Sequence, residues 1–483
     1  MAMRQCLRWM VVLVIGVAAA SPAHARNTAA AILRVEQGLR PLAIVDGQPQ
    51  PKWNIVERMK HYKVPGVSIA MISGGKVAWA RGYGVASNGK PVDTETLFQA
   101  ASISKPVTAL MALRLVDEGT LSLDEDVNLK LRSWKVPENE LTKTQKVTLR
   151  RLLNHSAGLT VRGFDGYAAG GPVPSLLDVL DGKKPANSEP IRVEAVPGTK
   201  WSYSGGGYVV VQQLVTDVTG ESFPELMQEE VLGPLGMVHS TFRQPLPANL
   251  AADAAAGYDS DGAMIKGRWH TYPEMAPAGL WTTPSDLARV VLELQRGGQI
   301  LKPATQRGML TKLLYDYGLG IGLEDKAGRT SFSHSGGNAG FNCNLFGYLD
   351  GGEGVVVMTN GDNGWPLIEE IMRSISAEYR WADYKQRKVV HVAPDTLQGY
   401  CGRYVLPSKK EIAVTCEDGK LFASYMGEKR FELLPETPTD FFTTDYQWPQ
   451  TFRFIRAGDN TVEMSLGSKV AKRQTAAPSE RPQ

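Results

Sequence analysis

Three short segments constrain the fold most, because their side chains form one chemical unit only if distant parts of the chain meet. They are Ser102-Ile-Ser-Lys105, Tyr203-Ser-Gly205 and His334-Ser-Gly336, in that order and a hundred or more residues apart. Together they provide a serine nucleophile, side chains that handle protons, and a glycine edge where backbone amides can approach a substrate oxygen. The sequence therefore predicts a catalytic serine site assembled from three regions.

The first segment has the pattern S-x-x-K, which is weak by itself. The same pattern occurs at Ser73–Lys76 and Ser87–Lys90, where a glycine precedes the lysine and strand-like runs flank the segment. Both of these are expected to be hairpin turns. Ser102 differs because an almost entirely apolar run, Pro106–Val116, follows it, which is typical of a buried helix.

On a helix, Ser102 and Lys105 share one face, so the lysine amine can reach the serine hydroxyl. Burial and the positive end of the helix dipole both disfavour the ammonium form, so Lys105 could act as a base. The alternative is that Ser102 or Ser104 only caps the helix and that Lys105 is solvated. The other two segments favour the catalytic interpretation.

Tyr203 and His334 each stand beside glycines. Tyr203 lies in Gly198–Tyr208, which we expect to be a glycine-rich loop from which a tyrosine can take or return a proton. His334 precedes Gly336-Gly337, where the lack of side chains lets a backbone N–H approach a substrate closely. The alternatives are simple packing for the tyrosine and a structural role for the histidine.

These motifs resemble those of the β-lactamase-related serine hydrolases, a superfamily that contains class C β-lactamases, D-alanyl-D-alanine carboxypeptidases, D-aminopeptidases and family VIII carboxylesterases. Leu152–Leu159, with the sequence L-L-N-H-S-A-G-L, is similar to the signature L-L-x-H-T-S-G-L of that superfamily. Ala278–Ala288 resembles its glycine-rich entry into a late helix. The resemblance runs from about Trp53 to Tyr384.

The resemblance implies a role for each matching residue. Ser102 would be acylated, Lys105 and Tyr203 would share proton transfer, and the backbone amides of Ser102 and Gly337 would form the oxyanion hole. Whether Lys105 or Tyr203 is the base in acylation stays open, because their titrations would be coupled.

Two positions depart from the β-lactamase pattern. Gly205 stands where the tyrosine motif usually ends in asparagine, and His334 replaces the lysine of the K-T-G motif. An imidazole is mostly neutral at pH 7 and suits a substrate carboxylate less well than an ammonium does. His334 is thus a catalytic candidate of the D-aminopeptidase and esterase type, with Ser335 and Gly336 as substrate-binding neighbours.

The resemblance implies an acyl-serine hydrolase without a cofactor, whose partner is a small-molecule ester, a D-amino-acid-containing amide or a peptide. The alternatives are a β-lactamase or D-Ala-D-Ala carboxypeptidase, and an inactive penicillin-recognising scaffold. Other hydrolase classes are not supported, since the sequence has no G-x-S-x-G elbow and no H-E-x-x-H zinc motif. No metal site is expected.

The N-terminus has the features of a secretory signal peptide. Arg4 and Arg8 precede a short apolar core, Trp9–Ala20, and Ser21–Ala25 ends in an A-x-A pattern, so we expect cleavage after Ala25. The core is too short for a comfortable membrane span, and Cys6 lies ahead of it, so no stable membrane anchor is expected. The mature protein should be secreted, to the periplasm if the source is Gram-negative.

The charge balance argues against polyanionic partners. The signal peptide carries two arginines and no acidic residue, so its removal changes the formal net charge from +3 to +1. Such a balance predicts neither nucleic acid nor acidic membrane as a partner. The sequence neither predicts nor excludes a homo-oligomer.

After a lead-in at residues 26–52, residues 53–384 have the element order of an α+β fold. Strand-like segments at both ends enclose long helical stretches, and a late helix is expected at Pro366–Tyr379. The expected strands are Gly66–Ile72, Lys76–Gly82, Gly318–Leu323, Phe341–Tyr348 and Val355–Thr359. This pattern predicts an antiparallel sheet with a helical insertion, the architecture of β-lactamases and penicillin-binding proteins.

Residues 395–472 contain seven short β-rich segments separated by turn residues, which predicts a small antiparallel barrel or sandwich. This region resembles the lipocalin-like domain appended to many of these hydrolases. Residues 473–483 are expected to be a disordered tail. Cys401 and Cys416 bracket a turn centred between Ser408 and Lys409, so a hairpin would allow a disulfide between them and leave Cys343 as a free thiol.

Overall fold

The computed structural model describes residues 22–45, 47–427, 429–445, 451–457, 460–467 and 469–474. Two parts of the chain far apart in sequence build its central sheet, in which all neighbouring strands are antiparallel. The strands, in spatial order, are β4 (Lys90–Pro91), β3 (Lys76–Ser87), β2 (Gly66–Ser73), β10 (Gly354–Thr359), β9 (Phe341–Tyr348), β8 (Arg329–Asn338) and β7 (Gly322–Lys326).

The pairing of β2 with β10 joins the early and late strands, as the sequence predicted. The two additional S-x-x-K segments are hairpin turns, since Ser73 pairs with Lys76 and Ser87 pairs with Lys90.

The strand expected at Gly318–Leu323 is wrong in its bounds, because β7 begins only at Gly322. The preceding residues form a turn instead. Gly320 has φ +91°, and a Cβ there would lie 2.6 Å from the Cβ of Ala109. Close packing against the helix that follows the nucleophile therefore explains this glycine better than a strand does.

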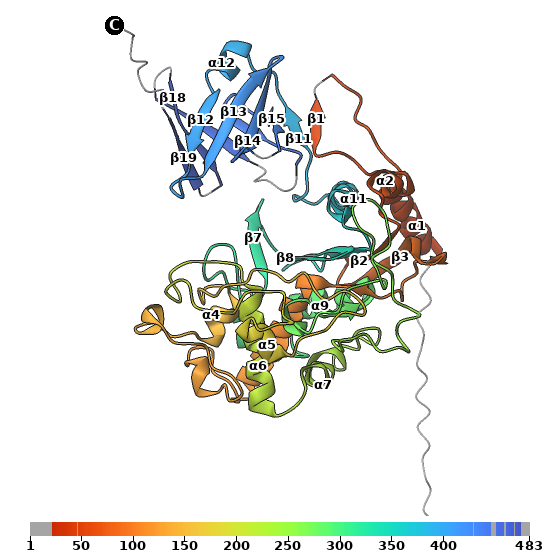
Figure 1. Cartoon of the computed structure of the whole chain (residues 1–483). Helices are drawn as coiled ribbons and strands as arrows, with labels where there is room; N and C mark the ends of the chain where they lie inside the picture. The colour runs from red at the N-terminus through yellow and green to blue at the C-terminus, as the bar shows by residue number, and fades with distance from the viewer. Residues whose placement is uncertain are drawn as a thin grey trace, which may run out of the picture.

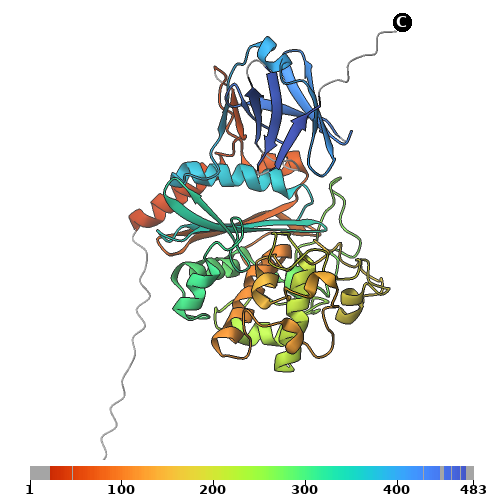
Figure 2. The same ribbon diagram turned by 90° about the vertical axis from the view of Figure 1, so that its left-hand side faces the viewer.

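Helices cover both faces of the sheet (Figure 2). On one face lie α11 (Gly364–Tyr379), α1 (Pro22–Glu36) and α2 (Ile55–Tyr62), and their apolar side chains share one core with β2, β9 and β10. The other face carries α9 (Pro284–Arg296) and the helical region. The longer helices of that region are α3 (Ser104–Asp117) and α6 (Gly205–Thr219), and the shorter ones are α4 (Leu149–Leu153), α5 (Leu176–Asp181), α7 (Phe223–Met227), α8 (Met275–Ala278) and α10 (Pro303–Met309).

The C-terminal region forms a closed barrel of eight antiparallel strands beyond the α11 face of the sheet (Figure 1). The strands are β12 (Gly402–Val405), β13 (Glu411–Glu417), β14 (Lys420–Tyr425), β15 (Phe431–Pro435), β16 (Asp440–Phe442), β17 (Phe452–Ala457), β18 (Asn460–Leu466) and β19 (Lys469–Arg473). The strand β19 is not among the strands expected from the sequence, and it closes the barrel by pairing with β12. Arg473 therefore belongs to the barrel and not to the expected tail.

The segment that connects the hydrolase unit to the barrel pairs with a strand of the N-terminal lead-in. β1 (Ala43–Val45) pairs in parallel with β11 (Arg387–Val389), and the short helix α12 (Pro394–Gln398) follows. The expected signal peptide lies mostly outside the described residues, as does the tail from residue 475. In the part of the chain that the structure describes, no helix is long and apolar enough to cross a membrane.

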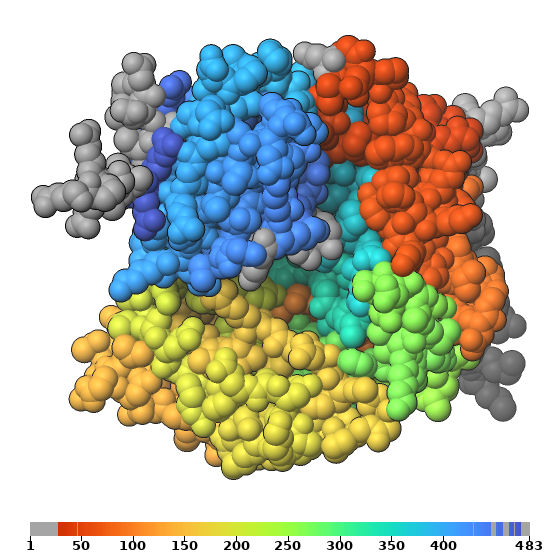
Figure 3. All heavy atoms as spheres, turned by 45° about the horizontal axis from the view of Figure 1, so that its top comes forward, coloured from red at the N-terminus to blue at the C-terminus, as the bar shows by residue number. Residues whose placement is uncertain are grey.

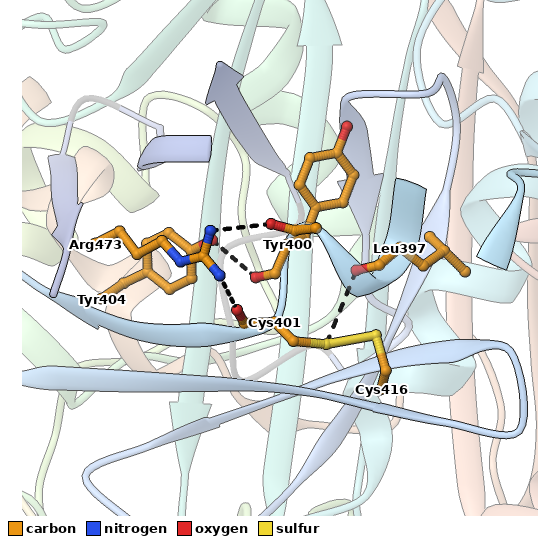
Figure 4. Close-up of a disulfide and its surroundings, with 7 residues drawn as sticks. Leu397, Tyr400, Cys401, Tyr404, Cys416 and Arg473 are labelled. Carbon is orange, nitrogen blue, oxygen red and sulfur yellow. Dashed lines mark hydrogen bonds between the residues drawn. A yellow bond between two sulfur atoms is a disulfide. The ribbon is translucent and has the colours of Figure 1, made fainter. Parts of the chain in front are cut away.

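Cys401 and Cys416 form a disulfide with a Cα–Cα distance of 6.2 Å (Figure 4). The register differs from the expected one. Gly402 pairs with Val414, so continuing this register places Cys401, which lies just ahead of β12, opposite Thr415. The bond thus joins β13 to the residue before β12 along a diagonal. Cys343 is a free, buried cysteine in β9.

Candidate active site

The backbone turn that carries Ser102 has a strained conformation and is hydrogen-bonded to a neighbouring segment. Ser102 lies in a 3-10 turn, Ala101–Ile103, immediately before α3, and Ala101 has φ +48°, a strained value for a residue with a side chain. The Ala100 N–H donates to the carbonyl of Leu280 at 2.8 Å. Ser102 itself is half-buried. It lies at the start of the buried helix α3, as predicted from the sequence.

Lys105 reaches Ser102 as the i, i+3 spacing predicted. Its Nζ donates to Ser102 Oγ at 2.9 Å and to the carbonyl of Pro277 in α8 at 3.1 Å. The side chain is only 2% exposed. Burial lowers the pKa of Lys105, while its interaction with Tyr203 acts in the opposite direction. A lysine in this setting loses its proton more easily than a solvated one and can act as a base.

Tyr203 lies directly before α6, with its ring centroid 4.8 Å from Lys105 Nζ. The expected glycine-rich loop, Gly198–Tyr208, is present up to Ser204 and wrong from Gly205 on, because Gly205–Gly207 form the first turn of α6. Ser204 caps this turn by accepting from Gly207 N at 3.0 Å. A Cβ on Gly206 would lie 2.7 Å from the Thr160 carbonyl. These glycines therefore allow tight packing that fixes Tyr203 in place.

His155 is a site residue that motif reasoning missed, although it stands in the signature string Leu152–Leu159. Its ring packs 4.3 Å from that of Tyr203, and its Nδ1 accepts the Ser204 N–H at 3.1 Å. The Nδ1 contact leaves the proton on Nε2 in the neutral ring. Burial, followed by the nearby Lys105, lowers the pKa of His155 well below its usual range, so this imidazole is uncharged.

His334 lies in β8 and is almost fully buried. Burial, with a further contribution from Lys105, lowers its pKa to about 3, so the ring is neutral at pH 7. Its Nδ1 lies 2.7 Å from the Ser335 carbonyl, which can only accept, so Nδ1 carries the proton and Nε2 is an acceptor. Nε2 has no partner among the described residues.

The two glycines after Ser335 have different surroundings. A Cβ on Gly336 would overlap the Ala100 carbonyl, so glycine is required for β8 to approach the turn that carries Ser102. No atom would lie within 4 Å of a Cβ on Gly337, which faces open space. Cys343 supports the same turn from β9 by donating its thiol to the Ala100 carbonyl at 3.0 Å. No local sequence pattern indicates this role of Cys343.

A cavity of about 710 Å³ opens beside the catalytic candidates. Tyr203, His334 and Ser335 line it, whereas Ser102, Gly336 and Gly337 are not among its lining residues. The other lining residues are Arg162, Trp201, Ser202, Tyr315, Asp316, Tyr317, Ser333 and Lys469. The buried polar atoms Trp201 Nε1 and Tyr317 OH, on two of these residues, have no hydrogen-bond partner within the described chain.

This arrangement is suited to nucleophilic chemistry at a carbonyl carbon. A hydroxyl, a buried amine and a phenol lie together, and a glycine-lined strand edge is positioned against the nucleophile turn. Within the described ranges, no group of three or more His, Cys, Asp or Glu side chains could hold a metal ion.

Two known proteins are similar to this chain in sequence. Penicillin-binding protein 4* of Bacillus subtilis is 24% identical over 441 residues, covering 84% of this chain and 91% of that protein. The unguisins hydrolase ungD of Aspergillus violaceofuscus is 28% identical over 246 residues, covering 47% of this chain and 41% of that protein.

Two solved structures have a similar fold. The octameric penicillin-binding protein homologue from Pyrococcus abyssi has a TM-score of 0.59 at 24% identity, covering 86% of this chain and 98% of that one. The D-amino acid amidase from Ochrobactrum anthropi, complexed with D-phenylalanine, has a TM-score of 0.55 at 19% identity. The match covers 67% of this chain and 97% of the amidase chain.

Family models divide the chain at the same place as the fold does. Residues 386–476 match a domain of unknown function, DUF3471, which corresponds to the barrel and the segment leading into it. Residues 53–376, well over half of the chain, match the model described as Beta-lactamase. The chain therefore belongs to the Beta-lactamase family and is a serine hydrolase of that family.

Proposed function

We propose that this serine hydrolase cleaves esters, or amides and peptides that contain a D-amino acid, through an acyl intermediate on Ser102. The observation that carries the proposal is the buried Lys105 amine 2.9 Å from the Ser102 hydroxyl, beside Tyr203. The likeness to a D-amino acid amidase supports the substrate class.

In acylation, Ser102 Oγ attacks the substrate carbonyl carbon and passes its proton to Lys105 or Tyr203. The negative charge that develops on the carbonyl oxygen is stabilised by the backbone N–H groups of Ser102 and Gly337. The tetrahedral intermediate then expels the alcohol or amine, which leaves with the proton held by the Lys105–Tyr203 pair. An ester bond to Ser102 remains.

In deacylation, a water molecule attacks the acyl carbon and gives a proton to the same pair. The bond between the acyl carbon and Ser102 Oγ breaks, and the proton returns to the serine. The product is the carboxylic acid. Because the Lys105 amine contacts Ser102 Oγ and lies beside the Tyr203 ring, either residue can be the base in a given step.

His334 favours this proposal over a β-lactamase or a D-Ala-D-Ala carboxypeptidase. Those enzymes bind a substrate carboxylate with the lysine of their K-T-G motif, whereas His334 is neutral and presents an acceptor nitrogen. An acceptor repels a carboxylate but can receive a hydrogen bond from a substrate amine, amide or hydroxyl. Gly205 also provides no side-chain amide for a penicillin-type substrate.

A side-by-side measurement of kcat/KM on a p-nitrophenyl ester, a D-alanyl anilide and nitrocefin tests the substrate class. We expect the ester or the anilide to be hydrolysed well above nitrocefin. Hydrolysis of nitrocefin with kcat/KM near about 10⁶ M⁻¹s⁻¹ would contradict the proposal, because this value lies within the range of efficient enzymes.

An inactive penicillin-recognising scaffold is the competing proposal. Labelling with a fluorophosphonate probe separates the two, since covalent reaction requires an activated serine. We expect one adduct per chain, on Ser102. An unlabelled protein that is folded by circular dichroism would favour the scaffold.

We further propose that the protein acts outside the cytoplasm. The charged start, the short apolar core and the A-x-A pattern at Ser21–Ala25 support export. N-terminal sequencing of the protein purified from its natural host should give Arg26 as the first residue. A retained Met1 would contradict export by this route.

A further inference from the structure

The cavity beside Tyr203 is built from both structural units. Ten of its lining residues belong to the hydrolase unit, and one, Lys469, comes from the barrel strand β19. In Figure 1, β18 and β19 lie side by side at one edge of the barrel, above the hydrolase unit, and Figure 3 shows the barrel resting over the yellow segments of that unit. The barrel therefore contributes a charged residue to the substrate cavity.

The position of Lys469 is fixed by a short hairpin. Lys469 pairs with Leu466, so only two residues connect β18 to β19, and the first of them, Gly467, has φ +57°. Side chains alternate along a strand, so Lys469 shares its side of β19 with Ala471, which is fully buried inside the barrel. Lys469 is exposed at the end of this inward-facing row, where its chain can extend beyond the rim.

The charges on the cavity wall do not balance. Asp316 shares Lys312 with Asp325, at 2.8 and 2.9 Å, and His334 is neutral. Arg162 and Lys469 are both exposed, and neither makes an ion pair within the described residues. The cavity therefore presents two cations that have no ion-pair partner within the described residues, one from each structural unit.

Aromatic side chains line the same cavity as the two cations and the catalytic candidates. The ring of Trp201 lies 5.8 Å from that of Tyr317 and 6.5 Å from that of Tyr315, and Tyr315 is 66% exposed. Such a wall contacts the apolar body of a substrate.

We propose that Arg162 and Lys469 form an anion-binding subsite that recognises a carboxylate on the substrate, at a distance from the bond that is cleaved. This inference rests on the proposed function, because it assigns a substrate feature to the same cavity. Guanidinium and ammonium groups donate charge-assisted hydrogen bonds to carboxylates. The barrel thus selects substrates that carry an anionic end beyond an apolar body.

Two matched pairs of esters test the proposal and locate the carboxylate. On the acyl side, the pair is p-nitrophenyl hemiglutarate and p-nitrophenyl valerate. On the leaving-group side, it is 4-carboxyphenyl acetate and 4-(methoxycarbonyl)phenyl acetate. The readout is the ratio of kcat/KM for the anionic over the neutral ester, because comparing this ratio between variants cancels the intrinsic reactivity of each ester.

We expect Lys469→Glu to lower this ratio by about tenfold in at least one pair, and Lys469→Arg to keep it within about twofold. This decrease in the ratio should be smaller at high ionic strength, because salt screens the charges of an exposed subsite. Lys472→Glu is the matched control, because Lys472 is exposed on the same strand but lies outside the cavity lining. A Lys469→Glu ratio within about twofold of the parent in both pairs would overturn the proposal.

A binding measurement keeps the subsite testable if no ester is hydrolysed, an outcome that would count against the proposed function alone. The probe is 4-phenylbutyrate, titrated calorimetrically into the Ser102→Ala protein. We expect its Kd to rise about tenfold when Lys469→Glu is added and to stay unchanged when Lys472→Glu is added. No detectable binding, or equal Kd values in the two double variants, would overturn the subsite.

Discussion

At the scale of single residues, Ser102 and Ser104 show how two hydroxyls in one motif acquire different roles. Ser102 Oγ accepts from the buried Lys105 amine and is half-buried. Ser104 is fully buried, and its Oγ donates to the Ala101 carbonyl at 2.6 Å and accepts the Leu280 N–H at 3.1 Å. Ser104 therefore holds the turn that presents Ser102.

The first prediction follows from this difference. Ser102→Ala should abolish acyl-enzyme formation, whereas Ser104→Ala should lose about 1–3 kcal/mol of stability through two missing hydrogen bonds and still form the adduct. Intact mass spectrometry after fluorophosphonate treatment measures both. A covalent adduct on the Ser102→Ala protein would disprove the assignment, because loss of such a nucleophile can lower rates by about a millionfold.

The second prediction concerns Tyr203. Tyr203→Phe removes one oxygen while keeping the ring contacts with His155 and Lys105. We expect normal folding and a loss of about 100-fold or more in kcat, the usual contribution of a general acid–base group. Steady-state kinetics on the best ester gives the value. If kcat stays within about threefold of the parent, Tyr203 does not transfer protons.

The third prediction is a pH dependence set by Lys105. Burial lowers the pKa of this lysine, so its neutral, basic form accumulates as pH rises and becomes dominant below the pH at which a free lysine titrates, about 10.4. The rate of fluorophosphonate labelling should therefore rise with pH and level off below that value. Tyr203→Phe should shift the rise to lower pH, because Tyr203 raises the pKa of Lys105. A labelling rate independent of pH between about 6 and 10 would contradict a lysine base.

Some of these residues could be predicted from the sequence, and others could not. Ser102, Lys105, Tyr203 and His334 stand in short motifs whose spacing has chemical meaning, so they were found as candidates. Cys343 and Lys469 act through contacts between residues far apart in sequence, for which no local pattern exists.

At the scale of elements, the short helix α8 links the catalytic lysine to a buried acid. Its Pro277 carbonyl accepts from Lys105, and Glu274 lies directly before it. Glu274 is fully buried, with Oε1 3.4 Å from the Tyr167 hydroxyl and Oε2 without a partner in the described chain. Burial raises its pKa to about 7.

The fourth prediction is a stability change that depends on Glu274. Its pKa is raised in the folded state, so the folded protein holds this proton more tightly than the unfolded one. The resulting stabilisation is complete below about pH 4.3 and is lost as pH rises through about 7, by roughly 3 kcal/mol. Urea unfolding at pH 5 and pH 8 should show a smaller loss for Glu274→Gln than for the parent. Equal losses would mean that Glu274 does not couple to folding.

The bounds of some helices and strands could be predicted from the sequence, and those of others could not. β9, β10 and α11 appear at nearly the expected bounds, because their apolar runs are long and bounded by turn residues. The strand β19 was missed because its sequence, Lys-Val-Ala-Lys-Arg, is mostly charged, and only barrel closure makes it a strand. The first turn of α6 was misread as a loop because glycine usually breaks helices, whereas here tight packing requires it.

At the scale of the whole molecule, contacts among the described residues tie the barrel to the hydrolase unit and to the segment that joins them. The strand pair β1–β11 holds the connection between them, Arg387 donates to Glu436 Oε1 at 3.0 Å, and Lys469 lines the catalytic cavity. The barrel is further stabilised by its disulfide, which Figure 4 shows beside Tyr404 and Arg473.

The fifth prediction concerns this disulfide. The mature, denatured and unreduced protein should contain one free thiol, Cys343, since Cys401 and Cys416 are bonded and the proposed cleavage after Ala25 would remove Cys6. Cys401→Ser together with Cys416→Ser should destabilise the barrel by about 2–3 kcal/mol, the usual effect for so short a loop. Titration with a thiol reagent gives the count. Three free thiols would show that the bond does not form in the host.

The pairing of β2 with β10 also determines when the protein can become active. Gly66–Ile72 must wait for Gly354–Thr359 before the sheet closes, and the turn that carries Ser102 is completed only by β8 and β9. Contacts this distant in sequence form late, because a long loop must be closed first. A ribosome that has synthesised two thirds of the chain therefore carries Ser102, Lys105 and Tyr203 without the strands β8 and β9 that complete the site. Hydrolysis is therefore expected only after the chain has been synthesised beyond Thr359, so the protein is inactive during most of its own synthesis.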